Sequence, residues 1–134
     1  MAGNPEHQVI KQFPTEKRLV RYIDENVNGA AIFLHEHEKR VRKETADTEK
    51  SSDDRMEINA AQRKRVALDA LRDRMREALD VKKDIEQLVG DPSKADELRE
   101  VAKGGLKTLR VLKNAFDNAV REILGDNNDE ESHA

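Results

Sequence analysis

An unbroken stripe of apolar and small residues runs through the last third of the chain, at alternating steps of four and three. Its members are Leu98, Ala102, Gly105, Leu109, Leu112, Phe116, Ala119 and Ile123. This spacing places all of them on one face of an α-helix. The stripe is widened on both sides by Val101, Leu106, Ala115 and Val120. Such a wide stripe predicts burial against at least two other helices, so it excludes a simple two-stranded coil.

Two earlier segments have a similar periodicity and predict the partner helices. The first helix is expected to begin near Thr15, with the series Leu19, Ile23, Val27, Ala30, Leu34, His37 and Val41. The second is expected from about 53 to 89, with the seam Leu68, Leu71, Met75, Ala78, Lys82, Ile85 and Val89. Ser52 is the expected N-cap of this second helix. A turn at residues 90–93 then leads into a third helix, from Ser93 to Leu124.

These segments predict an all-α fold, an elongated antiparallel three-helix bundle with coiled-coil-like packing. The alternative is a four-helix bundle, in which Gly29 splits the first helix. Two seam positions need a special neighbour. Gly105 predicts close approach by another helix, and Lys82 is a polar interruption of the kind that can set helix register.

The ends of the chain lack the helical stripe. Gly3, Pro5 and Pro14 predict an extended, polar N-terminal arm at residues 1–14. This arm is either a frayed terminus or a docking segment that buries Val9, Ile10 and Phe13 on a neighbour. At the other end, residues 125–134 predict an acidic flexible tail.

Residues 15–124 are expected to form a single helical-bundle domain. Within it, the segment at about 35–57 is rich in charge and poor in large apolar residues. Ion pairs between residues four apart can keep such a segment helical although it buries little. We therefore predict a polar hairpin tip there, between the first and second helices.

Composition limits the size of the core. Of the 134 residues, 36% are hydrophobic, 40% charged and 3% aromatic. A core this thin favours self-association, in which apolar stripes meet those of partner copies. The absence of Cys excludes disulfides and thiolate metal sites. We find neither an apolar run long enough to span a membrane nor a secretory signal, so we expect a soluble intracellular protein, cytoplasmic or within an assembled particle.

The segment His35-Glu36-His37-Glu38 has the composition of a metal site but not its geometry. Successive residues of a helix point about 100° apart, so the four side chains cannot converge on one ion. No other helix offers the residues that would complete a site built on His35 and Glu38. We therefore predict no metal and no cofactor, and we expect His37 at an interface because it lies on the apolar stripe.

Catalytic motifs are also missing. The sequence contains neither a Gly-x-Ser-x-Gly element nor a phosphate-binding loop of Walker spacing. Carboxylates are abundant, but they alternate with Lys and Arg as on exposed helix faces. We therefore predict that the protein is not an enzyme.

Basic residues suggest nucleic-acid contact as an alternative function. The candidates are Arg63, Lys64, Arg65, Arg72 and Arg76. A further stripe, Lys103, Lys107 and Arg110, has no acidic residue between 101 and 116. Such clusters can bind phosphate backbones, but no aromatic residues interleave with them for base stacking. Ordinary solvated helix faces have the same composition.

The favoured function is that of a non-enzymatic structural or interaction protein. A helical bundle of this kind would act in a protein assembly, for example as a phage or virion component or as a secretion or assembly chaperone or adaptor. Its expected partners are proteins, including further copies of the chain. The residues expected to form the core and assembly interface are Leu68, Leu71, Ile85, Leu98, Leu109, Leu112, Phe116 and Ile123.

Overall fold

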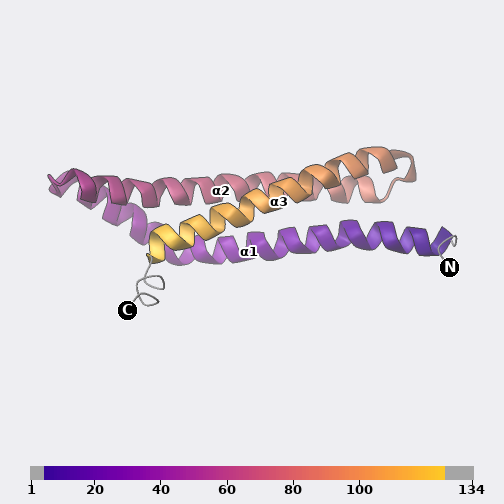
Figure 1. Ribbon diagram of the computed structural model, residues 1–134, viewed down its shortest axis with the longest axis horizontal. Helices are drawn as coiled ribbons and strands as arrows, with labels where there is room; N and C mark the ends of the chain where they lie inside the picture. The colour runs from indigo at the N-terminus through magenta and orange to yellow at the C-terminus, as the bar shows by residue number, and fades with distance from the viewer. Residues whose placement is uncertain (1–4, 126–134) are drawn as a thin grey trace.

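The computed structural model of the chain is a bundle of three long helices. Helix α1 spans Pro5–Ser51, α2 spans Arg55–Val89, and α3 spans Ala95–Leu124 after a short 3₁₀ helix, η1, at Pro92–Lys94. The structure describes residues 5–125, and for residues 5–15 it describes the backbone alone. Figure 1 shows an elongated bundle in which α2 runs antiparallel to α1 and α3. The predicted all-α three-helix bundle is confirmed.

Helix α1 begins ten residues earlier than the sequence predicted. The prediction of an extended arm is wrong for residues 5–14, which are helical. Pro5 lies at the helix start, where its fixed φ fits and its missing N–H would have no partner within the helix. Pro14 removes one backbone donor without ending the helix. The predicted docking residues Val9, Ile10 and Phe13 thus lie in α1, but their side chains are outside the described part.

Helix α1 is continuous through Gly29, so the four-helix alternative is wrong. Ile23 before the glycine and Ala30 and Leu34 after it are all buried on the same face. That burial outweighs the roughly 1 kcal/mol by which a glycine weakens a helix interior. The predicted acidic tail at 126–134 lies outside the described residues.

The turn between α1 and α2 corrects the predicted N-cap. Asp54, not Ser52, caps α2, because its Oδ1 accepts a hydrogen bond of 2.9 Å from the backbone N–H of Met56. Ser52 has a supporting role. Its Oγ accepts from the Asp54 N–H at 3.1 Å and donates to Glu57 at 2.7 Å, which holds the turn against the first turn of α2.

The turn between α2 and α3 is held by Asp91. Its Oδ1 accepts hydrogen bonds from the backbone N–H of Ser93 at 3.0 Å and from the Ser93 hydroxyl at 2.6 Å, and these bonds lower the pKa of Asp91. Residues 92–94 form the tighter η1, so α3 begins at Ala95 rather than at Ser93. Helix α3 ends at Leu124, and the residue after it, Gly125, has a φ of 75° that suits a residue without a β-carbon.

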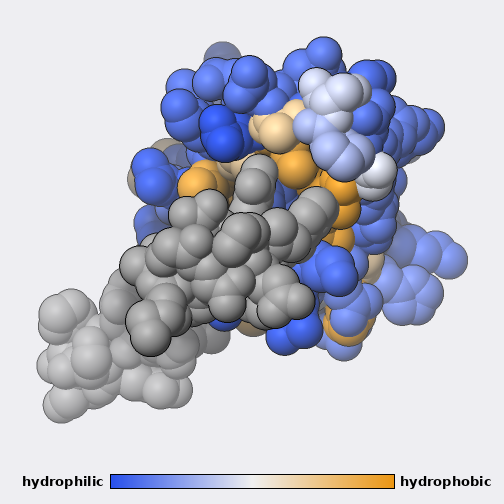
Figure 2. Space-filling view, turned by 90° about the vertical axis from the view of Figure 1, so that its right-hand side faces the viewer, coloured by the Kyte–Doolittle hydropathy of each residue, from blue (hydrophilic) through white to orange (hydrophobic). Residues whose placement is uncertain are grey.

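The core lies along the axis where the three stripes meet. It contains Leu19, Ile23, Ala30, Phe33, Leu34, Val41, Ala67, Leu68, Leu71, Ala78, Ile85, Leu98, Leu109, Leu112, Ala119 and Ile123. Seen from the end where α2 turns into α3, apolar side chains occupy the middle and hydrophilic ones the rim (Figure 2). The chain therefore buries its stripes within one copy.

The two special seam positions each have the neighbour that they require. A β-carbon on Gly105 would lie 3.0 Å from Val81 Cγ1 and 3.1 Å from Leu19 Cδ2, so α1 and α2 both approach α3 closely there. Lys82 Nζ lies 2.6 Å from Asp24 Oδ1 on α1, and this hydrogen-bonded contact raises the pKa of Lys82. The polar interruption is thus a link between helices α1 and α2.

The α1–α2 hairpin extends beyond the end of α3 (Figure 1). Near its tip the two helices are joined by polar contacts rather than by a large core. The buried Thr45 hydroxyl lies 2.8 Å from the Val41 carbonyl and 3.1 Å from the Ala61 carbonyl of α2. Gln62 donates to Glu49 at 2.8 Å. Among the described residues, no helix has the length and apolarity that a membrane span requires.

Candidate protein-interaction surface

The three seams between the helices differ in how they are closed at the surface. The α1–α2 seam is crossed by ion pairs, including Arg42 with Asp69 at 2.7 Å and Lys82 with Asp24 at 2.6 Å. The α2–α3 seam is crossed by Arg63 and Glu122 at 3.5 Å. Between α1 and α3, the described residues form no ion pair. The α1–α3 seam is therefore closed mainly by apolar contact, although the charge of Arg99 on α3 acts on Glu16 of α1.

Aromatic packing joins α1 and α3 in the middle of this seam. The rings of Phe33 and Phe116 meet edge to face with centroids 5.6 Å apart. His37 lies against Phe33 with ring centroids 4.6 Å apart, and its Nδ1 is 3.1 Å from an Arg40 nitrogen. His37 is half-buried, so it supports the seam from within a single chain.

An apolar hollow opens on the same seam, nearer the start of α1. It has a volume of about 140 Å³ and is lined by Glu16, Arg18, Leu19, Tyr22, Ala102 and Leu106. Two large side chains at this hollow are exposed, Tyr22 by 46% and Leu106 by 56%. We call this site the Tyr22–Leu106 hollow. It offers uncovered apolar surface from two different helices at one point.

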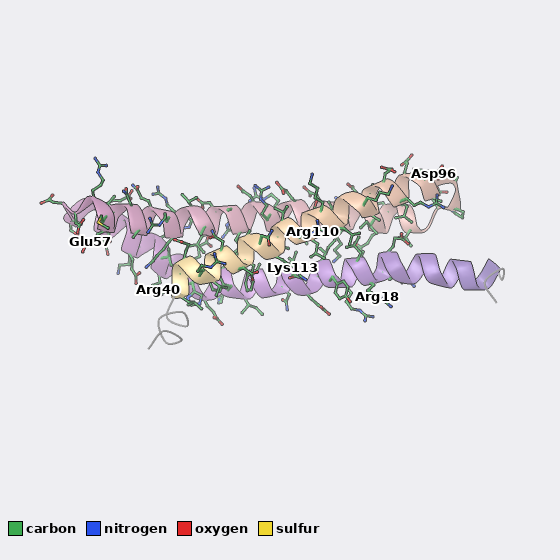
Figure 3. The ribbon with its side chains drawn as sticks, viewed as in Figure 1. Arg18, Arg40, Glu57, Asp96, Arg110 and Lys113 are labelled. Carbon is green, nitrogen blue, oxygen red and sulfur yellow. The ribbon has the colours of Figure 1, made fainter. Side chains whose placement is uncertain are left out.

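A row of cations follows the hollow along α3. We call Lys103, Lys107, Arg110 and Lys113 the α3 basic stripe, and all four are exposed. Lys103 lies 3.6 Å from Glu100, with both side chains mostly in solvent. The other three form no ion pair with described residues. In Figure 3, Arg110 and Lys113 project from α3 on the side where Arg18 lies on α1.

The cluster predicted for nucleic acid has a different environment. Arg63 pairs with Glu122, Arg65 lies 3.5 Å from Glu49, and Arg72 pairs with Glu38. Lys64 and Arg76 form no ion pair within the described residues. Three of the five residues predicted to contact nucleic acid therefore form ion pairs between helices instead.

Glu38 is the centre of this pairing. It accepts hydrogen bonds from Arg42 at 2.9 Å and from Arg72 across the α1–α2 seam. Burial favours the neutral carboxyl, but the hydrogen bonds from the two guanidinium groups outweigh it and lower the pKa of Glu38. Glu38 is thus held as an anion between a guanidinium group of α1 and one of α2. Among the described residues no group of three or more His, Asp or Glu side chains could hold a metal.

The residues predicted as core and assembly interface lie inside the bundle. Seven of the eight are buried, namely Leu68, Leu71, Ile85, Leu98, Leu109, Leu112 and Ile123. Phe116 is partly buried. These side chains pack within one chain, so they are not part of its exposed apolar surface.

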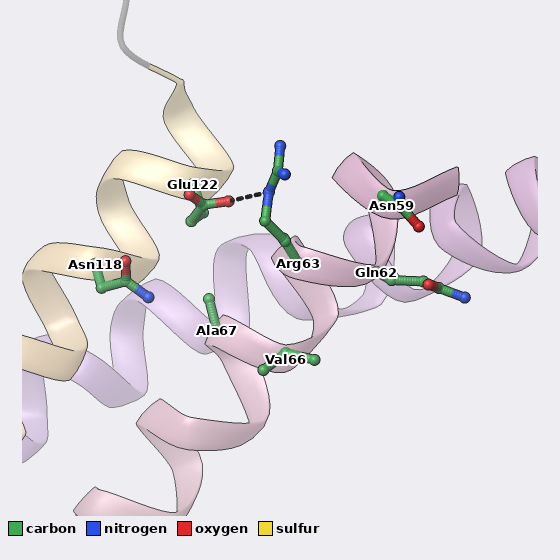
Figure 4. A pocket seen from close by; sticks show the side chains of 7 residues that line it. All are labelled: Asn59, Gln62, Arg63, Val66, Ala67, Asn118 and Glu122. Carbon is green, nitrogen blue, oxygen red and sulfur yellow. Dashed lines mark ion pairs between the residues drawn. The ribbon is translucent and has the colours of Figure 1, made fainter. Parts of the chain in front are cut away.

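A second surface hollow, near the end of α3, is lined by both polar and apolar side chains. Figure 4 shows this notch of about 530 Å³ between α2 and α3, lined by Asn59, Gln62, Arg63, Val66, Ala67, Asn118 and Glu122. The Arg63–Glu122 ion pair crosses it. Its three amides can exchange hydrogen bonds, but they supply neither a nucleophile nor a base.

Glu16 is a buried carboxylate at the edge of the Tyr22–Leu106 hollow. It is 5% exposed, and its Oε2 finds no hydrogen-bond partner in the described part of the chain. Burial raises the pKa of Glu16, opposed by a hydrogen bond from its own backbone and by the charge of Arg99.

Sequence reasoning missed Tyr22 and the continuation of the basic stripe at Lys113. Tyr22 lies off the apolar series of α1, so the periodic pattern did not indicate it.

A scan against protein-family models finds no match, and searches of curated proteins and of solved structures find none either.

Proposed function

We propose that this chain is a non-enzymatic interaction protein that binds a protein partner through the surface between α1 and α3. The observation that carries the proposal is the pairing of Tyr22 and Leu106, which are exposed together on one seam. Single exposed apolar residues are ordinary on protein surfaces. Two of them beside an apolar hollow, with an aromatic ring among them, are typical of a binding hot spot.

The energetics favour a partner on this seam. Burying the exposed part of a Leu side chain contributes roughly 1 kcal/mol, and an aromatic ring adds to this. The ion pairs on the other two seams offer less, because exposed polar side chains lose hydration when a partner covers them. A partner that covers the α1–α3 seam therefore gains more binding free energy than one that covers either of the other two seams.

An assembly role fits this reading. The proposal includes a virion component or a secretion or assembly chaperone or adaptor, because each of these works by binding rather than by chemistry. Self-association belongs to the same class. Mass measurement in solution across a concentration series separates a self-assembling subunit from a monomeric adaptor.

Nucleic-acid binding through residues 63–76 is the weaker candidate. Arg63, Arg65 and Arg72 each have a carboxylate partner, and binding a phosphate would mean giving up that pair. The electrostatic gain from counterion release is therefore partly cancelled. Retention of labelled DNA or RNA at low salt, lost on raising the salt, would favour this candidate.

The test of the proposed function is a comparison of two matched variants. Leu106→Asp places a charge at the hollow, and Leu79→Asp makes the same change on α2, where the side chain is 43% exposed. Each tagged protein is isolated from the cells that produce it, and the bound proteins are quantified. We expect a partner to be lost with Leu106→Asp and kept with Leu79→Asp. Equal recovery by wild type and both variants would reject the α1–α3 surface.

A further inference from the structure

We propose that the partner presents an acidic amphipathic helix to this surface. Its apolar face would fill the Tyr22–Leu106 hollow, and its carboxylates would pair with the α3 basic stripe. This inference rests on the proposed function, and it adds the chemistry of the partner. Three features of the described residues carry it: the position of the charges, their limits along α3, and the size of the hollow.

The charges and the hollow share one face of α3. Lys103 precedes Leu106 by three residues and Arg110 follows it by four, so both lie one turn away on the same side. Lys113 continues the row by another turn. A partner helix that inserts an apolar side chain beside Leu106 therefore brings its flanking residues next to these cations. Carboxylates are the groups that complement them.

The basic stripe is short and has acidic limits. From Lys103 to Lys113 it covers about 15 Å of helix, at about 1.5 Å per residue. Before it, Arg99 is paired with Asp96 at 3.3 Å, and after it Asp117 follows one turn after Lys113. A nucleic-acid backbone crossing this face lengthwise would continue over those carboxylates. A peptide helix of a few turns ends within the stripe, so the pattern favours a protein segment.

The hollow accommodates one large side chain. Its volume of about 140 Å³ is close to that of an apolar cavity of roughly 150 Å³ that holds a benzene ring. Its accessible lining is almost wholly apolar, because the unpartnered Oε2 of Glu16 is buried and does not face the open space. We therefore expect a Leu or an aromatic side chain at the anchor position.

Two other occupants fit less well. A second copy using the same surface would form a two-fold contact, in which each basic stripe faces the other and like charges repel. The chain's own residues 126–134 carry four carboxylates, Asp126, Asp129, Glu130 and Glu131, but no large apolar residue that could fill the hollow. The acidic helix therefore belongs to a different protein.

The test uses a displayed library of helical peptides of about 16 residues, a little over four turns. The library is selected against wild type, against the triple variant Lys103→Glu/Arg110→Glu/Lys113→Glu, and against a control with equal charge change, Lys39→Glu/Arg76→Glu/Lys83→Glu. All six side chains are exposed, so each variant should keep the fold, which circular dichroism and Tm verify.

We expect wild type and the control to enrich peptides with Trp, Tyr or Leu on one face and Asp or Glu beside it. The triple variant should instead enrich Lys or Arg at the flanking positions. Fluorescence anisotropy should show the best wild-type peptide binding the triple variant at least about tenfold more weakly, which corresponds to about 1.4 kcal/mol.

Three results would overturn the inference. Peptides enriched without acidic residues, or the same peptides for wild type and triple variant, would remove the electrostatic basis. Tighter binding of a DNA duplex of about 20 base pairs than of any peptide, at equal salt, would indicate a nucleic-acid partner. Dimers that Leu106→Asp dissolves, seen by sedimentation, would indicate a second copy. If Leu106→Asp loses its cellular partners while the selected peptides are not acidic, the inference fails and the proposed function stands.

Discussion

Gly105 on α3 lies so close to Val81 on α2 that a β-carbon at residue 105 would be 3.0 Å from Val81 Cγ1. Val81 is β-branched and stiff about χ1 in a helix, so it cannot rotate away. We expect Gly105→Ala to lower the free energy of unfolding by about 1–3 kcal/mol, because overpacking outweighs the gain in helix propensity. Urea unfolding followed by circular dichroism measures the change.

The neighbouring glycine provides the matched control. A β-carbon at Gly104 would have no heavy atom within 4 Å. Gly104→Ala should therefore stabilise the protein by about 0.5–1 kcal/mol through helix propensity alone. When Val81 is already Ala, adding Gly105→Ala should lower the free energy of unfolding by less than it does in wild type. Equal effects of the alanine at 104 and 105 would contradict the close approach of α2 to α3.

Leu112 tests whether α3 is the buried centre of the bundle. The side chain is completely buried, so Leu112→Ala should lower the free energy of unfolding by about 2–5 kcal/mol. Leu79, which is 43% exposed on α2, is the control, and Leu79→Ala should cost about 1 kcal/mol or less. A melting temperature unchanged by Leu112→Ala would show that the stripe of α3 does not form the core.

The fold could be predicted because burial and periodicity have one cause. Leu68 and Ile85 on α2 and Leu112 on α3 belong to apolar series of helical spacing. Each of the three is buried because it faces the bundle axis. Helix limits were harder. Pro14 predicted an extended arm, because a proline removes a backbone hydrogen bond and crowds the carbonyl four residues before it. Helix α1 nevertheless runs through Pro14.

The candidate site was less predictable because it depends on how helices lie beside one another. Glu38 and Arg72 are 34 residues apart in sequence, and their pairing depends on the register of α1 against α2. Without knowledge of that register, the sequence suggested that Arg72 was an unpaired cation. Tyr22 and Leu106 line one hollow only because α3 reaches α1 at that point, which no pattern along a single helix reports.

The corrected N-cap of α2 gives a local prediction. Asp54→Ala removes the acceptor of the Met56 N–H and should cost about 0.5–2 kcal/mol. Asp54→Asn keeps an acceptor oxygen and should cost much less. Thermal unfolding by circular dichroism compares these with Ser52→Ala, whose hydroxyl contacts are exposed. A larger loss for Ser52→Ala than for Asp54→Ala would make Ser52 the cap.

The raised pKa of Glu16 predicts the direction in which the stability of the fold changes with pH. Because burial raises its pKa in the folded protein, the folded state holds a proton that the unfolded state has already released. By linkage this lowers stability as pH rises through the unfolded pKa, and the loss is complete above the folded pKa. Below the unfolded pKa both states are protonated and the loss is absent.

The variant Glu16→Met isolates this effect, because every other carboxylate titrates in both proteins. At about pH 7, Glu16→Met should raise the free energy of unfolding by roughly 1–3 kcal/mol, since an unpartnered buried polar oxygen is removed. At about pH 4, near the ordinary glutamate pKa, the advantage should shrink because the wild-type carboxyl is then largely protonated in both states. Urea unfolding at both pH values measures the two differences. An advantage that grows toward low pH would mean that Glu16 is stabilised as an anion, and would assign Arg99 the dominant influence on it.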